Sequence, residues 1–189
     1  TTGGRISIVT GFGDGTSSGA LLLRTHDAGT GGESGHLVLS TGYATSGNSG
    51  ALFIGSGPST VGRGGSVYVT VGSGTSGSGG EMKLVAGSSS FSTGGRLSVI
   101  TGVGGKSTSG ALVLQTSDAG TAGVSGIAVL STGFASTGNS GSLYIGSGEA
   151  STGRSGSVYV TAGTGDSGDG GEIAITAGTS ATDTGGRVS

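Results

Sequence analysis

The chain is built from a repeat of about 15 residues, and this period limits the folds open to it more than any other feature. Each repeat opens with a glycine, and a short apolar run begins two residues later. One extra residue is inserted in the two repeats that start at Gly19 and Gly110. Short tandem periods of this kind are typical of solenoids, propellers and similar arrays. The opening glycines are Gly4, Gly19, Gly35, Gly50, Gly65, Gly80, Gly95, Gly110, Gly126, Gly141, Gly156, Gly171 and Gly186.

A second period of 91 residues contains six of these repeats. Arg5 recurs as Arg96, and Asn48 recurs as Asn139. Such matches indicate an internal duplication. The chain begins at "TTGGR" and ends at "DTGGRVS", the same point of the repeat, which favours a segment of a longer repetitive polypeptide. The predicted organisation is the end of a preceding coil at 1–3, a first six-coil block at 4–94, a second at 95–185, and the start of the next coil at 186–189.

Within each repeat, counted from its glycine as position one, apolar residues occupy positions three and five, as in Leu52 and Ile54. Alternation with period two between glycines predicts one short strand per repeat. Because every strand has the same frame, we predict an all-β fold, a parallel β-solenoid (β-helix) of about twelve coils of 15–16 residues in two blocks of 91 residues. The alternative is an antiparallel sandwich or barrel of twelve short strands.

The predicted solenoid gives each position of the repeat a structural role. Positions three and five fill one side of the interior, and the small residues at position ten allow the second face to approach closely. Glycines at the corners supply positive φ angles.

Position four of each repeat points away from positions three and five, so it faces outward in such a coil. Four consecutive repeats in each block carry an apolar residue there, and contiguous exposed apolar patches usually mark interaction sites. Cross-strand aromatic pairs within one sheet would also explain the pattern. The predicted self-association stripe consists of Leu22, Val38, Phe53, Tyr68, Val113, Val129, Tyr144 and Tyr159.

Composition argues against most other functions. The net charge is −2 without basic runs, which argues against nucleic acid as a partner, and no apolar stretch is long enough for insertion into a membrane. His26 and His36 are replaced by Ser117 and Ile127 in the second block, and the carboxylates are scattered. We therefore predict no catalytic residues, no metal site, no cofactor and no enzymatic activity.

The segments "SGALFIGSG", "SGSLYIGSG", "GGSVYVTVGSG" and "STGFASTGNSG" resemble the Gly/Ser/Thr-rich tandem repeats of secreted algal proteins. These include ice-binding-type β-solenoids and proteins of extracellular fibres or flagellar appendages. The resemblance covers the whole chain and implies an extracellular location, either secreted or on a surface appendage.

The first functional hypothesis is a non-enzymatic structural protein, a building block of a fibre, filament or surface appendage. Its partners are then other copies of itself or further repeats of a longer chain. The second is an ice-binding protein, and the third is a carbohydrate-binding or adhesive surface with polysaccharide as its partner. Ice binding would use a column of hydroxyl groups at position twelve, namely Thr30, Ser46, Ser76, Thr121, Thr137, Thr152, Ser167 and Thr182.

Overall fold

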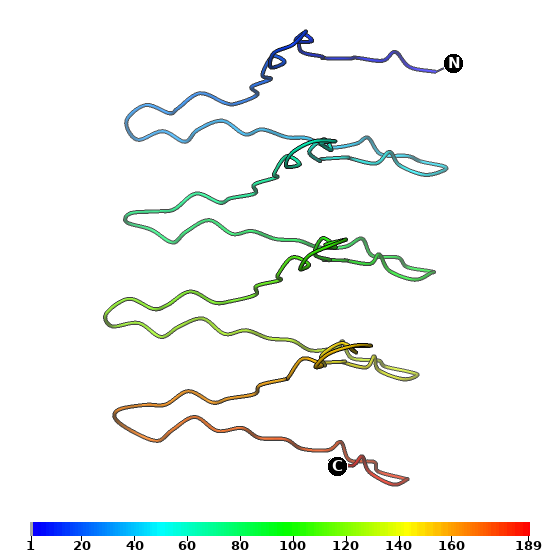
Figure 1. Cartoon of the computed structure of the whole chain (residues 1–189), viewed down its shortest axis with the longest axis vertical. Helices are drawn as coiled ribbons and strands as arrows, with labels where there is room; N and C mark the ends of the chain where they lie inside the picture. The colour runs from blue at the N-terminus through cyan, green and yellow to red at the C-terminus, as the bar shows by residue number, and fades with distance from the viewer. Residues whose placement is uncertain (1) are drawn as a thin grey trace. The chain divides into compact units, whose positions relative to one another are not determined.

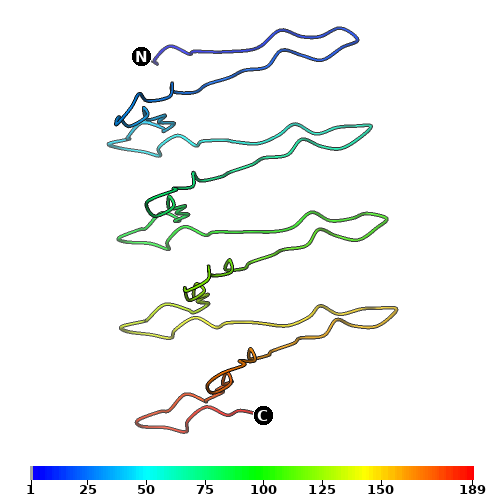
Figure 2. The same cartoon turned by 90° about the vertical axis from the view of Figure 1, so that its left-hand side faces the viewer.

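The computed structural model describes residues 2–189, and within that range it contains no helix and no strand. Extended segments alternate with bends, and each repeat contributes one bend (Figures 1 and 2). The chain reverses at each bend and forms a narrow loop. The bends lie at 14–16, 30–31, 45–47, 60–62, 75–77, 90–92, 105–107, 121–122, 136–138, 151–153, 166–168 and 181–183.

The chain divides into two units, Thr1–Arg96 and Leu97–Ser189. Several local contacts recur in both. Gly19 N–H donates to Gly11 O at 3.2 Å in the first unit, and 91 residues later Gly110 N–H donates to Gly102 O at 3.0 Å. The predicted limits of the repeat blocks stay a prediction.

Each loop closes where position seven of one repeat meets the glycine that opens the next, and we call this place the neck. In six necks that glycine donates its N–H to the carbonyl of the residue eight positions earlier, as Gly80 does to Gly72 at 3.2 Å. Such a bond joins two backbone segments that run in opposite directions on either side of the loop. A neck is therefore a contact within ten residues of sequence.

Three other necks are closed by a side-chain hydroxyl. Ser56 Oγ donates to Gly65 O at 2.7 Å, and Ser147 Oγ donates to Gly156 O at 2.8 Å, 91 residues later. Thr25 Oγ1 donates to Gly35 O at 3.1 Å. A Cβ added at Gly65 would lie 2.9 Å from Ser56 Cβ, well inside the 3.5–4.0 Å at which carbon atoms ordinarily meet. This neck therefore requires glycine at position 65.

The prediction that corner glycines adopt positive φ is confirmed in seven of the twelve bends of residues 2–189. Every positive φ among the described residues belongs to a glycine in a bend, for example Gly47 at 110° and Gly138 at 106°. Residues with a Cβ rarely adopt these angles. The full set is Gly15, Gly31, Gly47, Gly62, Gly138, Gly153 and Gly168.

The predicted β-solenoid (β-helix) is wrong, because residues 2–189 contain no strand. A parallel coil needs each extended segment to pair with the equivalent segment of the next repeat. Here the hydrogen bonds are made within a loop instead, between positions eight and one. The alternative of an antiparallel sandwich or barrel fails for the same reason, since it also needs strands.

The interior predicted at positions three and five is also wrong. No residue in the described range is buried, and Leu143 and Ile145 are 49% and 69% exposed. The accessible surface of the chain is 18,919 Å² at a mass of 17.5 kDa, whereas a globular monomer of that mass exposes about 7,900 Å². The partly covered residues all occupy positions seven and ten: Thr10, Gly13, Thr25, Ala44, Ala86, Thr101, Gly104, Thr116, Ala135 and Ala162.

Candidate association surface

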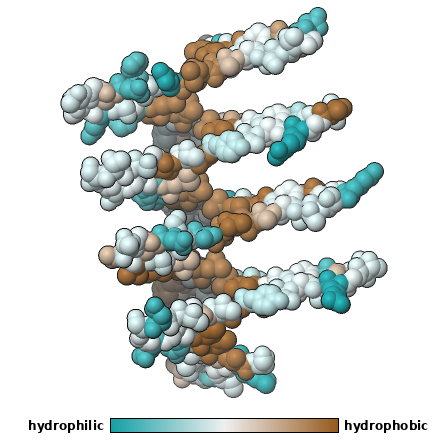
Figure 3. Space-filling view, turned by 60° about the vertical axis from the view of Figure 1, so that its left-hand side comes forward, coloured by the Kyte–Doolittle hydropathy of each residue, from teal (hydrophilic) through white to brown (hydrophobic). Residues whose placement is uncertain are grey.

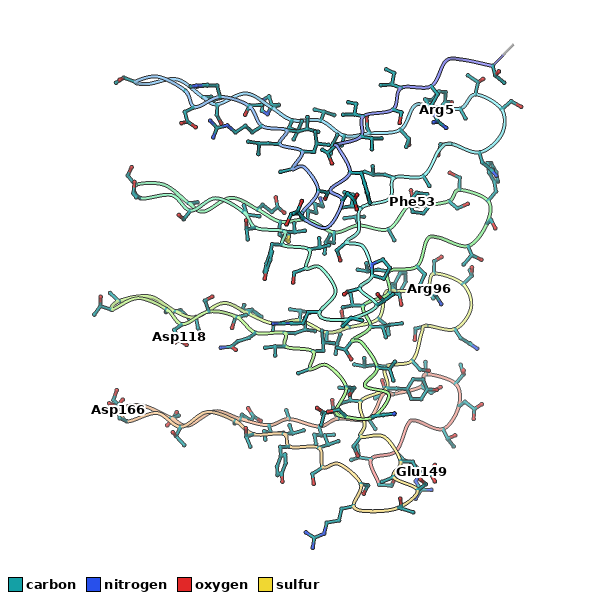
Figure 4. The ribbon with its side chains drawn as sticks, turned by 45° about the horizontal axis from the view of Figure 1, so that its top comes forward. Arg5, Phe53, Arg96, Asp118, Glu149 and Asp166 are labelled. Carbon is teal, nitrogen blue, oxygen red and sulfur yellow. The ribbon has the colours of Figure 1, made fainter. Side chains whose placement is uncertain are left out.

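The residues of the predicted stripe all lie on extended segments between bends. Their exposure ranges from 73% for Val113 to 91% for Phe53 and Tyr144, so they are not packed against one another within the chain. Figure 4 shows the side chains, including that of Phe53, standing out from a ribbon that does not enclose them. The structure therefore places the stripe residues on the outside of the chain.

The exposed fraction of the side chains alternates along the extended segments, although the described residues form no buried core. Leu143 is 49% exposed, whereas its neighbour Tyr144 is 91% exposed. Val158 and Tyr159 show the same contrast, at 53% and 87%. The side chain at position four is therefore the more accessible one in these repeats, as the period-two pattern predicts.

Apolar side chains gather on the extended segments rather than at the ends of the loops. In Figure 3 the brown residues lie at the base of the protruding loops, and the loops themselves are mostly pale or teal. This distribution follows from the repeat, because positions three to five are apolar and the bends consist mainly of Gly, Ser and Thr. Each extended segment is thus an exposed apolar surface between two polar loops.

The residues of the predicted ice-facing column all lie within bends, at the turn itself, as Ser46 does in 45–47 and Thr152 does in 151–153. Within residues 1–96, successive bends point in different directions (Figures 1 and 2). Hydroxyl groups on consecutive repeats of that unit therefore do not line one flat face. The ice-binding role of these residues stays a prediction.

The titratable residues are dispersed. His26 Nδ1 lies 3.2 Å from the carbonyl oxygen of Asp27, its neighbour in sequence. In the described part of the chain, no group of three or more His, Cys, Asp or Glu side chains could hold a metal ion, and no pocket is present. Nor does any helix in residues 2–189 have the length and apolar character needed to cross a membrane.

The closing function of position seven was missed by sequence reasoning. The signal is the small residue that occupies that position in most repeats, and the sequence pattern assigned it no contact of its own. Two bends carry a further hydroxyl contact that has no counterpart in the predictions. Ser92 N–H donates to Ser89 Oγ, and 91 residues later Asp183 N–H donates to Ser180 Oγ, both at 3.0 Å.

Comparison of the chain with protein-family models, with curated proteins and with solved structures finds no match.

Proposed function

We propose that this chain is a non-enzymatic extracellular structural protein that self-associates into a fibre or filament. The observation that carries the proposal is its exposed apolar surface. Its total accessible surface, polar and apolar together, is about 11,000 Å² larger than that of a globular monomer of its mass, and large apolar side chains such as Phe53 and Tyr144 are exposed within it. Because covering apolar surface is the main favourable term in association, a surface of this size favours a chain that is covered by something else.

A second copy is the occupant that the repeat pattern fits best. A standard protein interface buries about 1,600 Å² in total, so the excess surface would supply several such contacts. The apolar segments recur at a fixed spacing, and an identical chain has segments at the same spacing. Copies can therefore meet segment by segment, whereas an unrelated partner would have to reproduce that spacing.

The residues at position four are the contacts we assign to this association. Tyr144 and Tyr159 lie in neighbouring repeats and are 91% and 87% exposed. Aromatic side chains combine a large apolar area with little loss of conformational freedom, which makes them effective contact residues. Covering each ring is worth about 1.5–3 kcal/mol.

Sedimentation velocity and electron microscopy of the purified chain test the proposal. We expect concentration-dependent particles and filaments. The variant Tyr144→Ser/Tyr159→Ser should raise the concentration required for assembly by about 100-fold or more. The matched control Tyr43→Ser/Phe134→Ser removes two aromatic side chains at position nine and should change assembly far less.

A monomeric chain at high concentration would overturn the proposal. A monomer that lowers the freezing point of water below its melting point and shapes ice crystals would instead establish the ice-binding alternative. Assembly that is equally sensitive to both pairs of substitutions would keep a structural function but exclude the position-four contact.

A further inference from the structure

Two segments of the chain are richer in strand-forming side chains than the rest. Residues 67–71 are a run of five that are all β-branched or aromatic, and it is the longest such run in the sequence. The second longest, 158–161, begins 91 residues later at the equivalent position of the repeat. β-Branched and aromatic residues are the side chains most enriched in strands. We call 66–71 and 157–162 the valine segments.

The composition of the valine segments also suits contact between identical chains. Neither contains glycine, proline or a charged residue. Segments of about six residues with high β propensity and low net charge are those that pair between chains. Other extended segments carry Arg5, Arg24 or Lys83, and these would bring like charges together when two copies meet.

The backbone of both valine segments is extended and has no partner in the part of the chain that the structure describes. Among residues 2–189, no hydrogen bond involves a backbone N–H or C=O group of 66–71 or 157–162. The necks that follow them are closed by the next carbonyl along, Gly72 O in the first unit and Gly163 O in the second. An extended backbone with free N–H and C=O groups is a template for a strand from another chain.

The side chains of the valine segments are accessible on both faces. Val67 and Val69 are 54% and 70% exposed, and Tyr68 between them is 86% exposed. Because Val-Tyr-Val reads the same in both directions, pairing of two copies in either direction places tyrosine opposite tyrosine and valine opposite valine. Aromatic and β-branched pairs across neighbouring strands are stabilising.

We propose that copies of this chain join by strand addition, in which a valine segment of one copy pairs through its backbone with a valine segment of another. This inference rests on the proposed self-association and names the contact that produces it. A standard interface buries about 1,600 Å² in total, and the surplus accessible surface of this chain exceeds that several times over. Each strand has two backbone edges, so addition continues from copy to copy and builds a fibre.

Proline substitution tests the backbone contact. Val69→Pro/Val160→Pro removes one N–H donor from each valine segment, and proline has as many side-chain carbons as valine. The φ angle of proline also suits an extended chain. The concentration required for assembly should therefore rise by about 5- to 150-fold. The matched control Ile8→Pro/Val99→Pro alters the same position of the repeat in segments that carry an arginine, and it should change assembly far less.

Infrared spectroscopy, fibre diffraction and hydrogen exchange test whether strands form on assembly. Residues 2–189 of the single chain contain no strand, so the infrared signal of β-sheet should appear only above the concentration required for assembly. Aligned fibres should diffract at about 4.8 Å, the spacing of paired strands. Amides of 66–71 and 157–162 should exchange slowly in the assembly and rapidly in the dilute chain.

The outcomes separate this inference from the proposed function. Assembly without a β-sheet signal would refute strand addition and leave self-association intact. An equal loss of assembly in the two proline pairs would show that pairing is not confined to the valine segments, and the inference would be wrong. If the unchanged chain stays monomeric at high concentration, the proposed function fails, and strand addition fails with it.

Discussion

An alanine at the neck and an alanine beside it should have opposite effects on loop closure. In Gly65→Ala the new Cβ would lie 2.9 Å from Ser56 Cβ, so the two segments must separate. Separation breaks the 2.7 Å hydrogen bond from Ser56 Oγ to Gly65 O. Such a bond is worth about 0.5–1.5 kcal/mol net, so the ratio of closed to open loops should fall by about 2- to 13-fold.

The adjacent substitution Gly64→Ala is the matched control. A Cβ at Gly64 would have no atom within 4 Å, and its φ does not lie in the region reserved for glycine. Alanine there restricts the open chain without straining the closed loop. The substitution should therefore favour closure by about 0.4–1 kcal/mol, or about 2- to 5-fold.

Electron paramagnetic resonance measures the closure directly. The chain contains no cysteine, so cysteines introduced at Gly55 and Ser66, on either side of the neck, would be the only labelled sites. In the closed loop the two labels are held close together, whereas an open flexible segment of that length has a root-mean-square separation of about 18 Å. Dipolar broadening should decrease in Gly65→Ala and increase in Gly64→Ala. Equal broadening in the two variants would refute the neck as the closing contact.

Three further predictions concern the other loops and their hydrogen bonds. Ser147→Ala removes the hydroxyl whose hydrogen bond to Gly156 O is 2.8 Å long. The free energy of loop closure should become less favourable by about 0.5–1.5 kcal/mol, as measured by the same spin-label assay. Gly138→Ala places a side chain at φ 106° and should destabilise its bend by about 1–3 kcal/mol, whereas Gly133→Ala, which has no such angle, should not. Ala162→Ser should add a hydroxyl like that of Ser147 at the equivalent position, so that the loop before Gly171 closes more firmly and amide exchange at Gly171 slows. Faster exchange there than in the unchanged chain would contradict this prediction.

The sequence predicts the local features of this structure better than its long-range ones. The corner glycines and the small residues at position ten follow from steric limits on single residues, as Gly47 with its positive φ and the partly covered Ala44 illustrate. Alternation also predicts the difference in exposure between Leu143 and Tyr144. These inferences need no knowledge of which segments pair.

The pairing of segments could not be derived in the same way. An alternating segment such as Leu143–Ile145 specifies an extended backbone but not its partner, which is either the next repeat or the other side of its own loop. Closing a loop of nine residues costs about 0.5 kcal/mol less chain entropy than closing one of fifteen. Glycine also disfavours strands by about 0.5–1 kcal/mol per residue, and the chain contains 48 glycines. In the single chain, each repeat therefore closes its own loop, and the extended segments of successive repeats do not pair.

The candidate contact residues were identified from the column at position four, and the structure leaves them accessible. The column could not reveal that positions three and five stay exposed as well. Their exposure follows from the absence of pairing between extended segments of successive repeats in residues 2–189. The apolar surface available to a partner is thus larger than the stripe alone, and includes residues such as Leu52 and Val67, each more than half exposed.

Because each closing contact joins residues that are close in sequence, a chain of this kind can gain or lose whole repeats. The hydroxyl and glycine bonds at the necks join residues only eight to ten positions apart. Inserting or deleting a whole repeat would therefore leave the closing hydrogen bonds of every other loop intact, because each of these bonds is made within its own loop. Tandem duplication and loss can then vary the number of loops without any penalty to those that remain.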